Sequence, residues 1–121
     1  MTDRLDAVMV ELREFVGERD WEQFHDPKNL AMLLSSEAGE LLSQYRWIRN
    51  DEADSWSSTP DHHARVTAEA ADVGIALLMF CDRLKIDLIE AIKDKIEVNR
   101  ANYPAESTSG VPGRPDPDHR R

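Results

Sequence analysis

The sequence has few of the features that mark secreted or membrane-spanning proteins. Its single cysteine, Cys81, cannot form an internal disulfide, so nothing indicates an oxidised, secreted fold. Charged residues interrupt the N-terminus at once and leave no signal-peptide core. The longest apolar run, Val73–Cys81, is far too short to span a bilayer. We therefore expect a cytoplasmic protein.

Basic residues are also in short supply. Lys and Arg number 15 against 24 Asp and Glu, and the formal net charge is −9. Nucleic-acid duplexes are bound by clustered Lys and Arg, so this balance argues against a duplex as partner. It allows a single nucleotide, since a divalent cation can bridge an acidic protein and an acidic ligand.

Glycine is scarce as well, with 5 in 121 residues, while 40% of the residues are hydrophobic. This composition favours regular structure around one core. Apolar residues recur at three- and four-residue spacings, which predicts an all-α, four-helix bundle-like domain over residues 1–104. Residues 105–121 show no apolar periodicity and are predicted to form a disordered tail. The helices are expected at residues 2–18, 27–48, 60–84 and 88–102, the last with Asp87 as its cap, and connectors are expected at 19–25 and 49–58.

Acidic residues break the apolar pattern of two of these helices. At about 100° per residue, Glu37 falls in the middle of the apolar stripe of the second helix and Glu40 at its edge. In the third helix, Glu69 falls in the middle of the stripe and Asp72 at its edge. Burying unpaired carboxylates costs about several kcal/mol each, so the four acids predict a shared counter-ion. Oxygen ligands suit Mg²⁺, Mn²⁺ or Ca²⁺ better than Zn²⁺ or copper.

The last helix carries a second polar group. Lys95, Asn99 and Tyr103 share one of its faces. Taken alone, this pattern needs no binding site, because Lys95 can extend its charged end into solvent and Asn99 can end the helix. Beside an acidic metal site, the same three become candidates for binding phosphate and sugar. Residues that could stack on a nucleobase are Trp21, Phe24, His25 and Trp47, and for Phe24 a packing role is preferred.

Three ordered motifs resemble those of the MazG-like, all-α nucleoside triphosphate pyrophosphohydrolases: E-x-x-E at 37–40, E-x-x-D at 69–72 and K-x-x-x-N-x-x-x-Y-P at 95–104. The connector at 19–25, continuing to Leu30, is similar to the single-domain dCTP pyrophosphatase branch of that family. The animal dCTP enzymes of this branch carry a histidine on the first helix and a tyrosine one turn after the motif aspartate, where this sequence has Leu12 and Ala76.

The resemblance implies a helical homo-oligomer, a dimer or a tetramer, that acts on nucleoside triphosphates. It implies hydrolysis of the α–β phosphoanhydride to a monophosphate and pyrophosphate, with removal of surplus or non-standard nucleotides as the role. Mg²⁺, with Mn²⁺ as a substitute, would bind Glu37, Glu40, Glu69 and Asp72, and Glu37 or Glu40 would activate water. Lys95 and Asn99 would contact phosphate or sugar with Tyr103 nearby, and Trp21 and Trp47 would enclose the base.

Two other interpretations remain open. One is a di-iron carboxylate bundle, but such bundles use two Glu-x-x-His pairs, and the pair at 22–25 lies in a connector. The other is a non-catalytic helical module that binds metal or nucleotide, in which the acids pair with basic residues across a subunit interface. Self-association is expected independently, because the helix around Val73–Cys81 is apolar on all sides and needs cover from partner subunits.

Overall fold

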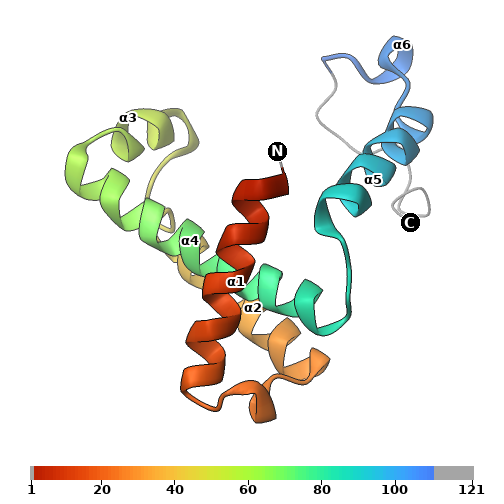
Figure 1. The fold of residues 1–121 in the computed structure, drawn as a ribbon. Coiled ribbons are helices and arrows are strands. Elements are labelled where there is room, and N and C mark those ends of the chain that lie inside the picture. Colours follow the sequence, from red (N-terminus) through yellow and green to blue (C-terminus); the bar gives the residue numbers. More distant parts are fainter. Residues whose placement is uncertain (1, 111–121) are drawn as a thin grey trace. The chain divides into compact units, whose positions relative to one another are not determined.

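The computed structural model describes residues 2–110, and its helices follow the apolar periodicity of the sequence (Figure 1). No strand occurs among these residues, so the all-α prediction is confirmed. The helices in chain order are α1 (Thr2–Glu18), η1 (Glu22–Phe24), α2 (Pro27–Ser43), η2 (Asn50–Glu52), α3 (Ala53–Ser57), α4 (Pro60–Arg83), α5 (Leu88–Asn102) and α6 (Ala105–Thr108).

Capping residues set the starts of two of the predicted helices. The side chain of Asp26 accepts a hydrogen bond from the backbone N–H of Asn29 at 2.9 Å, and Pro27 occupies the first helical position. Asp87 caps α5 in the same way, by accepting from the backbone N–H of Glu90 at 3.1 Å. These bonds satisfy N–H groups that have no partner within the helix, which is why the starts could be predicted.

The structure differs from the predictions at three places. Helix α2 ends at Ser43, and the expected continuation to residue 48 is a series of turns, with Ile48 N–H donating to the carbonyl of Tyr45. The connector 49–58, expected to be a loop, contains η2 and α3. Beyond residue 104, α6 forms where no regular structure was expected, and residues 111–121 lie outside the described part.

Aromatic and hydroxyl contacts hold α3 against its neighbours. The Trp56 and His62 rings stack, with centroids 4.0 Å apart and planes 15° apart. His62 Nδ1 also lies 2.9 Å from the Trp56 carbonyl oxygen. On the other side, the Tyr45 hydroxyl lies 2.7 Å from Ser57 Oγ. Helix α3 is therefore held both to the start of α4 and to the turns that follow α2.

The chain forms two units, divided after Ile86. In the first unit, α2 and α4 make the closest helix pair, and α1 crosses them (Figure 1). Its buried hydrophobic residues, the core, are Val16, Leu30, Ala76 and Cys81. The second unit contains α5 and α6, and α5 has no fully buried residue. The predicted limit of the helical domain at residue 104 stays a prediction.

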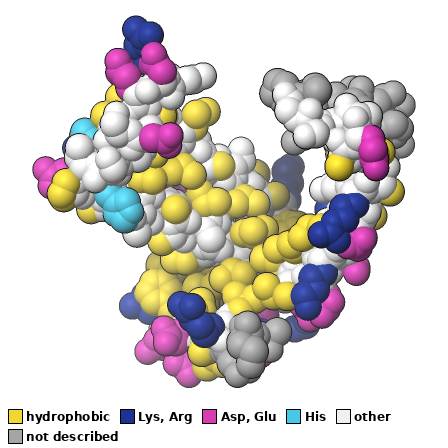
Figure 2. Space-filling model, turned by 90° about the horizontal axis from the view of Figure 1, so that it is seen from above, with side chains coloured by type: hydrophobic (Ala, Val, Ile, Leu, Met, Phe, Trp, Pro, Cys, Tyr) yellow, Lys and Arg dark blue, Asp and Glu magenta, His cyan; other side chains and the backbone are white. Residues whose placement is uncertain are grey.

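Much apolar surface of the first unit remains exposed. Hydrophobic side chains are open to view on the face shown in Figure 2. Val8, Ile75 and Leu84 are among the exposed large hydrophobic residues, with 47%, 41% and 44% of their surface accessible. In the part of the chain that the structure describes, no helix has both the length and the apolar character of a membrane span.

Candidate functional site

Carboxylates from α2 and α4 meet between the two helices. Glu37 on α2 and Glu69 and Asp72 on α4 each offer one oxygen, and these oxygens all lie within 4.8 Å of one another. Glu37 and Glu69 are half-buried and Asp72 is exposed, as expected for residues in the middle and at the edge of an apolar stripe. We call these three residues the carboxylate cluster.

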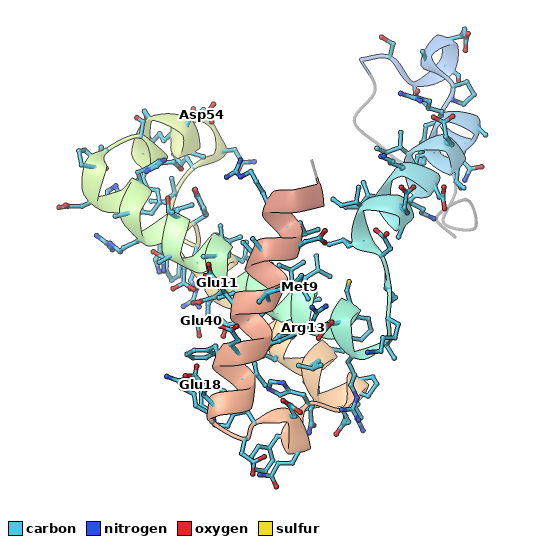
Figure 3. All side chains as sticks on the ribbon, in the orientation of Figure 1. Met9, Glu11, Arg13, Glu18, Glu40 and Asp54 are labelled. Atoms are coloured by element: carbon cyan, nitrogen blue, oxygen red, sulfur yellow. The ribbon has the colours of Figure 1, made fainter. Side chains whose placement is uncertain are left out.

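Glu40 does not belong to the carboxylate cluster. It lies one turn after Glu37 on α2, and its side chain is exposed (Figure 3). Its influence on the cluster is electrostatic, because its charge contributes to raising the pKa of Glu37. The structure thus brings together three of the four predicted metal ligands, and coordination by Glu40 stays a prediction.

The charges of the carboxylate cluster repel one another. Burial, and then the negative charges of Asp72, Glu69 and Glu40, raise the pKa of Glu37 above its ordinary value. Among residues 2–110, none of the ion pairs includes a cluster carboxylate. A group of three carboxylate oxygens without a cationic side chain has the donor chemistry that Mg²⁺, Mn²⁺ or Ca²⁺ prefers. The residues present therefore fit a hard divalent cation.

The predicted phosphate-binding residues lie in the second unit. Lys95 and Asn99 are exposed on α5, and Tyr103 follows its last turn, where its backbone N–H donates to the Asn99 carbonyl at 2.8 Å. Lys95 and Asn99 thus share a helical face, whereas Tyr103 lies just beyond the helix end. Participation of these residues in one site with the carboxylate cluster stays a prediction.

The predicted base-stacking residues have different surroundings. Trp21 packs edge-on against Phe15, with ring centroids 5.6 Å apart. Trp47 is 86% exposed, and the guanidinium of Arg46 lies 5.9 Å from the centroid of its ring. His25 is half-buried and lines a cavity in the first unit. Neither tryptophan lines that cavity.

This cavity has a volume of about 390 Å³ and was not predicted from the sequence. Its apolar walls come from α1, α2 and α4, and its polar lining includes Arg13, Glu22 and Asp82. Arg13 on α1 donates two hydrogen bonds to Asp82 on α4, from Nε at 3.0 Å and from an Nη at 2.7 Å. Such a pair joins residues far apart in sequence, so helical periodicity carries no signal for it.

Comparisons with known proteins agree with the motifs. No family model matches the chain. Human dCTP pyrophosphatase 1 is 40% identical over 92 residues, which cover 76% of this chain and 54% of the human protein. The bovine protein of the same name is 37% identical over 97 residues, covering 80% of this chain and 57% of its own length. The chain thus spans little more than half of these curated relatives.

A solved structure matches over nearly its whole length. The crystal structure of a pyrophosphatase from Archaeoglobus fulgidus has a TM-score of 0.79 and 40% sequence identity, covering 84% of this chain and 93% of the archaeal one. Fold and site together define an all-α protein with a carboxylate cluster between paired helices. With the similarity to these pyrophosphatases, the chain belongs to the MazG-like family of all-α pyrophosphatases.

Proposed function

We propose that the protein is a Mg²⁺-dependent nucleoside triphosphate pyrophosphohydrolase. It cleaves the α–β phosphoanhydride of deoxynucleoside triphosphates, with dCTP or a modified dCTP as preferred substrate, and releases a monophosphate and pyrophosphate. The carboxylate cluster between α2 and α4 carries the proposal, because it offers metal-binding oxygens that take part in none of the ion pairs within residues 2–110. The names of the mammalian relatives support the choice of substrate.

The metal ligands in this proposal are Glu37, Glu69 and Asp72, with Glu40 as a fourth from the adjacent turn. A bound Mg²⁺ offsets the repulsion between acidic protein and triphosphate and polarises the phosphorus under attack. Mn²⁺ has the same ligand preference and is expected to substitute. The half-buried positions of Glu37 and Glu69 keep part of the water away from the ligand oxygens.

Water is the proposed nucleophile. Cys81 is unsuited to that role, because it is buried and burial raises the pKa of its thiol, which keeps it protonated. Glu37 and Glu40 are the candidate general bases.

The remaining predicted residues bind the other parts of the substrate in this proposal. Lys95 and Asn99 contact phosphate or sugar, and Tyr103 lies just beyond them at the end of α5. Of the predicted base-binding residues, His25 lines the cavity of the first unit, and contact of Trp21 and Trp47 with the base stays a prediction. A cytoplasmic location, expected from the sequence, stays part of the proposal.

We also propose that the protein is a homo-oligomer, a dimer or a tetramer. The support is the small core of the first unit, where Val73–Cys81 is apolar at nearly every position yet only Ala76 and Cys81 are buried within it. A second copy would cover the remaining apolar surface.

The test is to incubate the purified protein with each deoxynucleoside triphosphate and MgCl₂ and to measure pyrophosphate and monophosphate. We expect equal amounts of the two products, with none after chelation by EDTA. Release of orthophosphate and a diphosphate would contradict cleavage at the α–β bond. If no canonical or modified triphosphate is hydrolysed, the enzymatic proposal is wrong.

A further inference from the structure

The cavity of about 390 Å³ lies in the first unit, along the same helix pair as the carboxylate cluster. Leu30 lines the cavity two helical turns before Glu37 on α2, and Met79 lines it two turns after Asp72 on α4. Two turns return a side chain to nearly the same face, about 10 Å along the axis. A ligand with phosphates at the cluster could therefore place its other end in the cavity.

The cavity combines apolar walls with a polar lining that includes Asp82, which pairs with Arg13, and also Glu22, Arg83 and Lys85. Met9 and Leu12 on α1, Leu30 on α2 and Met79 on α4 line it, and such apolar walls suit the faces of a flat ring. Met9 and Arg13 project from the same side of α1 in Figure 3, with Glu11 on the opposite side. A pocket of this size lies within the range of small-molecule sites, which is about 300–1,000 Å³.

Asp82 has one oxygen engaged and one open. Both hydrogen bonds from Arg13 end on Oδ1, and no residue between 2 and 110 donates a hydrogen bond to Oδ2. The Asp82 side chain is 30% exposed, so most of it is shielded from solvent. Arg13 therefore fixes the carboxylate and leaves a negatively charged acceptor in the lining of the cavity.

We propose that Asp82 selects the base of the nucleotide, an inference that rests on the proposed pyrophosphohydrolase function. The open Oδ2 accepts a hydrogen bond from the exocyclic amine of an aminopyrimidine such as cytosine, a pairing that carboxylates make with the cytosine amine in nucleic acids. Uracil or thymine would place a carbonyl oxygen against the same carboxylate, and two acceptors repel. Asp82 is thus a specificity-determining residue, and Arg13 is the positioning residue that holds it.

The decisive variant is Asp82→Asn, assayed as kcat/KM for dCTP and for dUTP with MgCl₂. We expect the wild-type protein to prefer dCTP by about 10-fold or more, which is the effect of one hydrogen bond to a charged group. In the variant, the amide can donate to a carbonyl oxygen, so the preference should fall about 10-fold. Glu22→Gln, at another carboxylate of the cavity lining, is the matched control and should leave the ratio unchanged.

A charge swap separates base selection from a structural role of the Arg13–Asp82 pair. The double variant Arg13→Asp/Asp82→Arg keeps an ion pair between α1 and α4 but exchanges acceptor and donor. We expect it to recover the melting temperature lost in Asp82→Arg alone without recovering the preference for dCTP. Recovery of both would show that the pair only joins the helices and would overturn the proposal.

The outcomes also separate this inference from the proposed function. If the wild-type protein hydrolyses dCTP and dUTP equally well, or if Asp82→Asn keeps the wild-type ratio, base selection by Asp82 is wrong and the enzymatic proposal stands. If no deoxynucleoside triphosphate is hydrolysed, both are wrong.

Discussion

At Glu37, burial and three neighbouring carboxylates act in the same direction and raise the pKa of this side chain above the ordinary value of a glutamate. Without metal, the folded protein then binds a proton at Glu37 more tightly than the unfolded chain does. The free energy of unfolding therefore falls as the pH rises from the ordinary pKa of a glutamate through the raised pKa of Glu37. We expect urea unfolding in EDTA to show this decline, and Glu37→Gln to reduce it. A variant with the wild-type pH dependence would contradict the electrostatic interpretation.

The negative charge of Glu37, which is unfavourable in the metal-free protein, should be required for activity with Mg²⁺. We expect Glu37→Gln and Asp72→Asn to lower kcat with MgCl₂ by about 100-fold or more, because each removes a charged metal ligand. In differential scanning fluorimetry, Mg²⁺ should stabilise the wild type more than either variant. Asp54→Asn, at an acid on α3 away from the cluster (Figure 3), is the control and should retain activity. Full activity in both cluster variants would refute the metal assignment.

At this scale, the sequence was informative where a residue broke a local pattern. Glu37 and Glu69 interrupt apolar stripes, so the helical wheel alone identified them as half-buried acids. The contact between Arg13 and Asp82 spans 69 positions and depends on how α1 crosses α4. No local pattern encodes that crossing, and this is why the cavity and its polar lining were missed.

At the scale of elements, α3 connects the two helices that carry the carboxylate cluster. The half-buried Trp56 stacks on His62 at the start of α4. We expect Trp56→Ala to lower the free energy of unfolding by about 1–3 kcal/mol, below the range for fully buried aromatic residues because Trp56 is half-buried. Urea denaturation measures this value. His63→Ala, at the exposed neighbour of His62, should change it by less than about 0.5 kcal/mol. Equal effects would show that the stack does not stabilise the fold.

The elements with clear start signals were predicted well, and the short ones were not. Asp26-Pro27 and Asp87 make local hydrogen bonds or restrict the backbone, so the starts of α2 and α5 follow from nearby residues. Helix α3 has 5 residues, too few for apolar periodicity to show. Its position depends on contacts of Trp56 and Ser57 with residues on other elements, which a local pattern cannot reveal.

At the scale of the whole molecule, the first unit leaves many apolar side chains exposed that its small core does not bury. Its buried hydrophobic residues are Val16, Leu30, Ala76 and Cys81, whereas Ile75 on α4 is 41% exposed. Exposed apolar area of this kind on a folded chain marks an interaction surface. A second copy is the occupant we propose, because the apolar character of α4 around Ile75 extends to all its sides.

The proposed assembly is tested by size-exclusion chromatography with light scattering, in which we expect the mass of a dimer or a tetramer. Ile75→Lys should shift the protein toward the monomer. Burying an isoleucine contributes about 1.5–3 kcal/mol, and a twofold interface contains the residue twice, so the dissociation constant should rise by about 100-fold or more. Thr67→Lys adds the same charge to α4 at an exposed polar position and should leave the mass unchanged. If the wild-type protein elutes as a monomer at micromolar concentrations, the apolar surface of α4 is not covered by a second copy.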